Sequence, residues 1–391
     1  MPNYNRTRRA CFFTYIASGA AFTLPALLFV TFRETFGISD TLLGTLVLIN
    51  FCTQLGIDLI FSFFAKYFSV KLSVRVMPIL TSVGLCIYAL VPAFFPQYAY
   101  AGLVCGTVIF SLAAGLSEVL ISPLVAALPS ENPGRDMSLL HSIYAWGVLF
   151  VVAVTTVFFY FFGTENWMYL TLGFACLPLV LFVMFCTSPI PDMEIGHKPS
   201  EGGAGRVGFA MVLFVVCIFL GGAAECAMTN WISAYAERVL GMPKAVGDIF
   251  GLALFALLLG LGRTIYARYG KRIDNVLLCG MIGATVCYLV AGLSPFPIVS
   301  MIACVLTGFC TSMLWPGTLI MMEEKFPNPG MAAYALMAAG GDLGGSVAPQ
   351  LLGVVSDAAG METAMTVGTV FPAVGVFVII FIKRYFNKTE N

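Results

Sequence analysis

Apolar stretches of roughly 20 residues recur along the whole of this sequence, and they constrain its fold more than any other feature. A helix of that length crosses about 30 Å of hydrocarbon, and lipid tolerates only helices or closed barrels. We count twelve such stretches, which run approximately over residues 10–33, 41–65, 72–95, 98–128, 137–162, 167–187, 208–236, 245–268, 273–293, 297–322, 331–355 and 361–382. With 59% hydrophobic and 10% charged residues, the chain cannot coat a soluble globule. The sequence therefore predicts an all-α membrane protein with twelve transmembrane helices.

Positive charge is unevenly distributed over the loops between these stretches. When alternate loops are assigned to opposite sides of a membrane, 17 of the 20 Lys and Arg residues fall on the side of the N-terminus. Only Arg33, Arg238 and Lys244 fall on the other side. By the positive-inside rule we expect a cytoplasmic (inner) membrane protein with both termini in the cytoplasm and a retained first helix. The basic loops fit topology and contact with the lipid bilayer, so we expect no nucleic-acid partner.

A hydrophilic segment rich in Gly and Pro divides the apolar stretches six and six. This segment, residues 188–206, predicts a flexible cytoplasmic linker between an N-terminal six-helix bundle, residues 1–187, and a C-terminal six-helix bundle, residues 207–391. The fourth, seventh and tenth apolar stretches would each be the first helix of a three-helix unit, and all three share one spacing of residues. Counted from a glycine, the spacing places further residues at offsets of three and eight, in the sets Gly115, Glu118 and Pro123; Gly222, Glu225 and Asn230; and Gly308, Thr311 and Pro316. An Asn-Pro-Gly turn follows the first and the last set, at 132–134 and 328–330. Doubled three-helix repeats are typical of secondary transporters.

This layout resembles the major facilitator superfamily over the whole chain. The resemblance implies two pseudo-symmetric six-helix bundles whose rocking opens a central site to one side of the membrane at a time. The loop signature that this family carries between spans two and three, Gly followed by Asp, Arg and Gly, is replaced here by the run from Ser62 to Lys71. The resemblance therefore depends on the repeat, the topology and the number of spans.

Four acidic residues lie well inside the apolar stretches: Asp58, Glu118, Glu225 and Asp342. An acid at mid-membrane costs about 2.5 to 3.5 kcal/mol on insertion scales, so such residues usually face a cavity or a partner. A structural salt bridge or a permanently protonated carboxyl is the alternative for each. Asp342 lies among the small residues 339–345, which favours a structural or gating contact there.

Proton coupling is the role that we predict for Glu118, Glu225 and His141. A carboxyl whose surroundings alternate between wet and dry can take up and release a proton. Ser111 and Ser122 lie on the same helix face as Glu118 and could extend a hydroxyl network to it. His141 lies in the next span, although a lone His among apolar residues is more often simply hydrogen-bonded.

Substrate binding is the second role that we predict for Glu225, shared with Asn230, Trp231 and Tyr235 on the following turns. Acid and amide groups bind hydroxyls, and the flat face of Trp covers the apolar face of a sugar ring, so this set suits a polar, ring-shaped solute. An interfacial aromatic belt is the alternative, because a straight helix carries Tyr235 to the outer membrane boundary.

The run from Ala223 to Glu225, with Trp231 and Tyr235, resembles the span-seven pattern of sugar transporters related to the fucose–galactose–proton symporters. In span four that group typically has Glu, three residues, then Asn-Pro, where this chain has Glu118 and Ser122-Pro123. The resemblance implies that Glu118 is a proton site. This chain departs from the group in that Ser and in having no acid in span one between Ala20 and Phe29.

Four further positions complete the predicted substrate-binding set. Asn50 and Gln54 lie at successive turns of one face with Asp58, and such a stripe lines a pathway or forms a hydrogen-bond ladder between helices. Tyr144 in span five is a candidate contact. Trp315 precedes a proline in span ten and is a candidate substrate contact, with a kinked gate or ordinary packing as the alternatives.

Other classes of protein find little support in this sequence. No GxxxxGK[ST], HExxH or GxSxG motif occurs, so we predict neither an ATP-driven motor nor an enzyme, and no cofactor. The twelve Cys residues all fall in spans without a CxxC pair, which favours packing over disulfides or a metal site.

We predict a monomeric secondary active transporter that takes up a small polar solute, a sugar or sugar derivative, by alternating access with H⁺ as the coupling ion. An exporter or organic-anion carrier of the same fold is the alternative within transport. A non-transporting membrane sensor is the alternative outside it.

Overall fold

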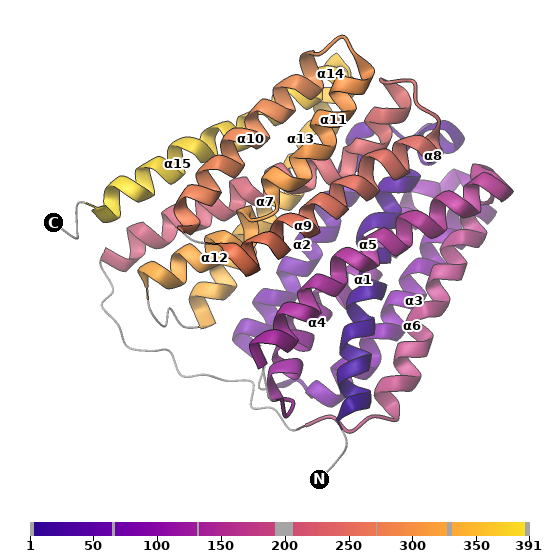
Figure 1. Ribbon diagram of the computed structural model, residues 1–391. Coiled ribbons are helices and arrows are strands. Elements are labelled where there is room, and N and C mark those ends of the chain that lie inside the picture. The colour runs from indigo at the N-terminus through magenta and orange to yellow at the C-terminus, as the bar shows by residue number, and fades with distance from the viewer. Residues whose placement is uncertain are drawn as a thin grey trace. The chain divides into compact units, whose positions relative to one another are not determined.

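The computed structural model describes residues 4–64, 67–130, 133–191, 206–270, 272–326 and 331–387 (Figure 1). Within these ranges the regular secondary structure is helical throughout. Six long helices make up the first half: α1 (Asn5–Phe36), α2 (Asp40–Phe64), α3 (Val70–Phe94), α4 (Ala99–Ala127), α5 (Pro133–Phe162) and α6 (Trp167–Cys186). Short 3₁₀ turns, η2 (Pro96–Tyr98) and η3 (Thr164–Asn166), lead into α4 and α6.

The second half contains three unbroken helices: α7 (Arg206–Arg238), α10 (Ile273–Leu293) and α13 (Met331–Ala359). Its other three predicted spans are each divided, into α8 (Lys244–Gly247), the π-helix η4 (Asp248–Ala253) and α9 (Leu254–Tyr269); α11 (Pro297–Thr311) and α12 (Leu314–Lys325); and α14 (Met361–Gly368) and α15 (Val370–Asn387). The described helices thus occupy the positions of the twelve predicted spans.

The helices are long and apolar enough for a multi-pass membrane protein. Among the described residues, 10 helical stretches have the length and composition to cross a bilayer. Trp146–Phe162, in α5, is a shorter apolar helix. The 188–206 linker beyond residue 191, Asn132 and the 328–330 turn lie outside the described residues, apart from Arg206 at the start of α7.

The chain divides into two compact units. Unit 1 comprises Met1–Ile38 and Ile49–Gly196, and unit 2 comprises Ser39–Leu48 and His197–Asn391. The first turns of α2 are therefore grouped with the second half of the chain, although the sequence places them in the first.

Close contacts between helices hold unit 1 together. Helix α3 packs along α4 and α6, and α1 packs along α5. Glycines permit these approaches: a Cβ at Gly84 would lie 2.5 Å from the backbone nitrogen of Phe110, and one at Gly19 would lie 2.8 Å from the carbonyl carbon of Gly147. Small residues at such crossings are typical of membrane helices, whose association depends on packing rather than on the exclusion of water.

In unit 2, helix α7 packs against α13, and α10 packs against α11 and α15. A Cβ at Gly344 of α13 would collide with the carbonyl oxygen of Phe219 of α7, so only glycine fits at this crossing. The run of small residues around Asp342, for which a structural or gating contact was predicted, lies along this contact. Asp342 itself is buried.

A polar cluster anchors the start of α2 within unit 2. The carboxylate of Asp357, at the end of α13, accepts hydrogen bonds from the backbone N–H groups of Asp40 (3.1 Å) and Thr41 (2.6 Å). Such a carboxylate satisfies N–H groups that the first turn of a helix leaves unpaired. Asp40 is fully buried and pairs with Arg238 of α7 at 2.7 Å, and Ser356 donates to it at 2.6 Å.

Candidate functional site

Glu225, at the middle of α7, forms an ion pair inside unit 2. Its partner is Arg263 of α9, whose Nη2 lies 3.3 Å and 3.4 Å from the two carboxylate oxygens. The Glu225 side chain is 17% exposed and that of Arg263 is 31% exposed. An ion pair in the middle of apolar helices that still reaches open space is a site where a polar solute can bind. The salt bridge that the sequence left as an alternative for Glu225 is therefore present.

A break between two helices positions the guanidinium of Arg263. Helix α11 ends at Thr311 and α12 begins at Leu314, and Arg263 Nε donates to the carbonyl oxygen of Ser312 in the gap at 3.0 Å. Because a helix end leaves carbonyl groups without partners, the break supplies an acceptor for the Arg263 side chain.

Trp315 lies one residue beyond the start of α12 and is half-buried. A Cβ at Gly222 of α7 would lie 3.0 Å from its ring, and one at Gly341 of α13 would lie 2.5 Å from it. The two glycines therefore give the indole a flat surface to lie against. Gly222 precedes Glu225 by three residues, which places it about one turn away on nearly the same face of α7.

Trp231 and Tyr235 are packed into the interior of unit 2. Each is 1% exposed. The indole N–H of Trp231 donates to the carbonyl of Pro349 at 3.0 Å, and the hydroxyl of Tyr235 donates to the carbonyl of Ala291. Both rings therefore join α7 to other helices instead of forming a lipid-facing belt, and their predicted contact with substrate stays a prediction.

Two other polar side chains of α7 bond within the helix. Asn230 is 8% exposed and donates to the carbonyl of Cys226 at 2.9 Å. Thr229 donates to the backbone carbonyl of Glu225 at 2.8 Å, not to its carboxylate. Neither residue extends the ion pair.

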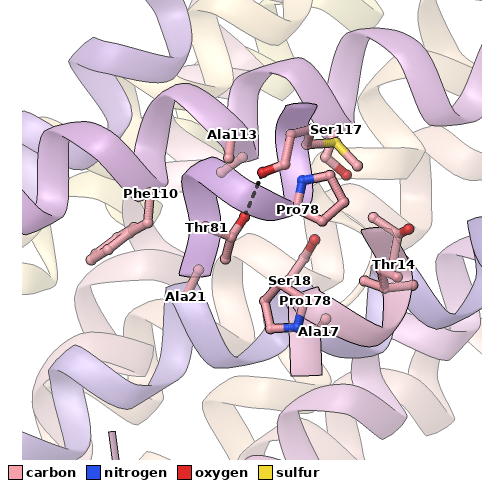
Figure 2. A pocket seen from close by; sticks show the side chains of 13 residues that line it. Thr14, Ala17, Ser18, Ala21, Pro78, Thr81, Phe110, Ala113, Ser117 and Pro178 are labelled. Atoms are coloured by element: carbon pink, nitrogen blue, oxygen red, sulfur yellow. Dashed lines mark hydrogen bonds between the residues drawn. The ribbon is translucent and has the colours of Figure 1, made fainter. Parts of the chain in front are cut away.

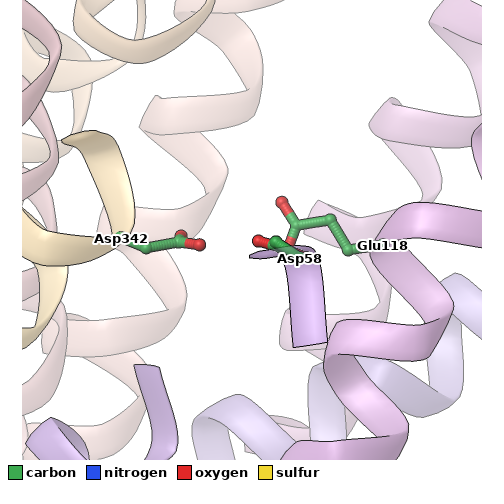
Figure 3. Close-up of side chains that lie close together, drawn as sticks. All are labelled: Asp58, Glu118 and Asp342. Atoms are coloured by element: carbon green, nitrogen blue, oxygen red, sulfur yellow. The ribbon is translucent and has the colours of Figure 1, made fainter. Parts of the chain in front are cut away.

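Two acidic residues meet inside unit 1. Asp58 of α2 and Glu118 of α4 have carboxylate oxygens within 4.8 Å of each other (Figure 3). Glu118 is exposed within the unit, and Asp58 is half-buried. Two ionised carboxyl groups at this separation would repel each other, so the two side chains interact electrostatically.

Asn50 and Gln54 form a hydrogen-bond ladder from α2 to α4. Gln54 Nε2 donates to Asn50 Oδ1 at 3.0 Å, and the hydroxyl of Ser111 donates to the same oxygen at 2.6 Å. All three side chains are buried. Of the two alternatives for this stripe, the structure contains the ladder, and Ser111 bonds to Asn50 although the sequence suggested a network with Glu118. The substrate contacts predicted for Asn50 and Gln54 stay predictions.

Tyr144 and His141 both lie on α5. The ring of Tyr144 meets that of Phe22 edge-on, with centroids 6.1 Å apart, and is half-buried. The side chains of His141, Ser122 and Pro123 lie outside the described residues. Their predicted parts in the proton route stay predictions.

Unit 1 contains a small cavity among α1, α3, α4 and α6 (Figure 2). Its lining includes the hydroxyl residues Thr14, Ser18, Thr81 and Ser117, among apolar side chains. The cavity volume is about 20 Å³, which is enough for about one or two water molecules. This cavity is therefore too small for a sugar.

The sequence reading did not identify Arg263 as the partner of Glu225. Its signal was an Arg within the apolar run Leu257-Leu-Leu-Gly-Leu-Gly-Arg263. The fold brings it to the level of Glu225, 38 residues earlier in the chain.

Comparisons with known proteins agree with this architecture. The sequence profile described as Major Facilitator Superfamily matches residues 11–275 and 249–391. The membrane protein MosC of Rhizobium meliloti is 25% identical over 391 residues, which cover 96% of this chain and 91% of that protein.

Solved structures share the fold at low sequence identity. The inward-open xylose transporter XylE from E. coli has a TM-score of 0.78 at 16% identity, over 97% of this chain and 96% of that chain. The E. coli fucose:proton symporter FucP has a TM-score of 0.65 at 15% identity, over 97% of this chain and 99% of that chain. The predicted all-helical fold is thereby confirmed. Because the family profile spans nearly the whole chain, the protein belongs to the major facilitator superfamily of membrane transporters.

Proposed function

We propose that this protein is a secondary active transporter that takes up a sugar or sugar derivative together with protons. The observation that carries the proposal is the Glu225–Arg263 pair, a charged but internally neutral site that stays partly open between apolar helices. By the repeat and the superfamily fold, the two six-helix bundles, 1–187 and 207–391, expose the solute to one side of the membrane at a time. Both termini lie in the cytoplasm, as the distribution of Lys and Arg favours.

The chemistry of the pair suits a neutral, hydroxyl-rich ring. A hydroxyl group both donates and accepts, so neighbouring hydroxyls can bond to the carboxylate of Glu225 and to the guanidinium of Arg263 together. The half-buried indole of Trp315, near the turn of α7 that precedes Glu225, offers an apolar face for the C–H side of such a ring. Two solved relatives in fold are a D-xylose–proton symporter and a fucose–proton symporter, which supports a sugar as substrate.

The acid pair of unit 1 supports H⁺ as the coupling ion. Asp58 and Glu118 lie close enough for the charge of one carboxyl group to affect proton binding by the other, and Glu118 is exposed within its unit. A carboxyl that is reachable from solvent in one state and shielded in another can load and release a proton during transport.

The alternatives differ from this proposal in what they would bind. An organic-anion carrier would need a cation to receive the anion, and Arg263 is already paired with Glu225. An exporter would move the same kind of solute in the opposite direction. A sensor would bind without transport, and an enzyme would convert its solute, whereas we propose a monomeric carrier that leaves the solute unchanged and needs no cofactor.

Uptake into proteoliposomes tests the proposal. An inside-alkaline pH gradient should drive accumulation of radiolabelled D-glucose, D-xylose or L-fucose above the level reached without a gradient. Failure to accumulate any of the three sugars would refute sugar–proton symport.

Two variants test the coupling role of the acid pair. Glu118→Gln should keep sugar exchange between equal concentrations and lose gradient-driven accumulation, because it cannot release a proton. Glu34→Gln alters an exposed carboxylate at the end of α1 and serves as the control that keeps both activities. Accumulation by Glu118→Gln at the wild-type level would remove Glu118 from the proton route.

A further inference from the structure

We propose that Arg263 is a substrate-binding residue that, with Glu225, selects neutral sugars against charged analogues of the same shape. This inference rests on the proposed function and assigns a specificity to one site within it. Arg263 lies outside the set of substrate contacts that the sequence indicates, and its role follows from its geometry.

The hydrogen-bonding capacity of the pair is only partly used. A guanidinium carries five N–H donors, and Arg263 uses its Nε toward Ser312 and its Nη2 toward Glu225. Neither donor of Nη1 has a partner among the described residues. The contacts to the carboxylate, at 3.3 and 3.4 Å, are long for a charged pair, which usually measures about 2.7–2.9 Å. Because N–H donors of Arg263 and the carboxylate of Glu225 have hydrogen-bonding capacity left, a polar solute could bind to both.

The position of the guanidinium is fixed independently of Glu225. Its bond to the Ser312 carbonyl holds it against the break between α11 and α12. A Cβ at Gly262, the residue before Arg263, would collide with the side chain of Ser312, so glycine is needed there for α9 to approach the break. A donor held by the backbone stays oriented while a ligand exchanges with the carboxylate, which lowers the cost of binding.

The charges of the pair predict the selectivity. A neutral ring can accept from Arg263 and donate to Glu225 without an excess charge. An ammonium group on the ring is attracted to Glu225 but repelled by Arg263, and a carboxylate is attracted to Arg263 but repelled by Glu225. For either charged solute the net attraction is therefore small and does not offset the free energy that its desolvation costs. Removing one member of the pair should therefore reverse the preference toward the ligand whose charge complements the member that is left.

Three solutes with one ring and different charges test this: D-glucose, D-glucosamine and D-glucuronate. Their binding is measured by calorimetry at pH 6.5 on the purified full-length protein. Wild type should favour glucose. Arg263→Gln should lose about ten- to a hundredfold in glucose affinity, the usual range for a hydrogen bond to a charged group, and should come to prefer glucosamine. Glu225→Gln should come to prefer glucuronate.

Two further variants separate a binding role from a structural one. The double variant Glu225→Gln with Arg263→Gln removes both charges, so a purely structural pair should regain glucose affinity in it, whereas a binding Arg263 should leave the affinity low. Lys383→Gln breaks the ion pair with Asp274 elsewhere in unit 2 and should leave the order of the three solutes unchanged.

The outcomes distinguish this inference from the proposed function. Wild-type protein that binds none of the three solutes would overturn the sugar substrate and this inference with it. Glucose binding that survives Arg263→Gln, an unchanged order of the solutes, or recovery in the double variant would overturn the role of Arg263 alone.

Discussion

Neutralising Asp40 should destabilise the protein far more than neutralising a comparable acid at the surface. Asp40 is fully buried, and its carboxylate receives Arg238 Nη1 at 2.8 Å and 2.7 Å and the Ser356 hydroxyl at 2.6 Å. Removing one partner of a buried ion pair costs about 3–5 kcal/mol, because the other charge is left without compensation. Arg238 is 24% exposed and can recover some hydration, so we expect Asp40→Asn to cost about 3 kcal/mol, the lower end of that range.

Asp274→Asn is the matched control. Asp274 pairs with Lys383 at 2.9 Å, but the two side chains are 37% and 27% exposed, and such a pair contributes about 0–1 kcal/mol. At about 1–2 °C per kcal/mol for a chain of 391 residues, Asp40→Asn should lower the melting temperature in detergent by about 3–6 °C, and the control by less than about 2 °C. Adding Arg238→Gln to Asp40→Asn should restore part of the loss. Equal shifts for the two single variants, or no rescue, would refute the view that burial makes this pair important.

Three more substitutions, one of them with a matched control, test buried contacts between helices through thermal unfolding of the purified protein. Gly344→Ala should destabilise it, because the new methyl group meets the backbone of α7, whereas Gly173→Ala, with open space around it, should be neutral or stabilising by up to about 1 kcal/mol; similar melting temperatures would contradict the crossing. Trp231→Phe replaces the buried indole by a smaller aromatic ring and removes a buried donor, so it should cost at least about 1–3 kcal/mol with little change in sugar affinity, and a large loss of affinity in a stably folded variant would instead indicate substrate contact. Ser111→Ala should cost about 0.5–1.5 kcal/mol by removing the bond to Asn50, and an unchanged melting temperature would argue against the ladder.

The positions of the spans could be predicted because lipid sets the length of a helix. The apolar stretch 273–293 coincides with α10, Ile273–Leu293, and the other spans agree within a few residues. Hydropathy measures how much apolar sequence is available, not how the backbone hydrogen bonds continue through it. For that reason the breaks in the stretches 245–268, 297–322 and 361–382 were not anticipated, although one of them supplies the Ser312 carbonyl to Arg263.

The partners of the polar residues depended on contacts between distant parts of the chain. The acids Asp58, Glu118 and Glu225 could be identified from the sequence because placing an acid inside a bilayer costs free energy. That cost depends on the residue type and not on which residue is its neighbour. The residue type of Trp231 suggested a sugar contact, yet its indole N–H donates to the carbonyl of Pro349, more than 100 residues away.

The sequence by itself determined that this chain crosses a membrane many times and that a few carboxyl groups lie inside apolar helices. These are properties of length, periodicity and the transfer free energy of each residue, which do not depend on its neighbours in space. Only the tertiary structure decided that Glu225 pairs with Arg263 and that Asp58 approaches Glu118. It also decided that the first backbone N–H group of α2 donates to the carboxylate of Asp357. Such pairings depend on how helices rotate and cross, and packing between side chains and backbone sets that geometry.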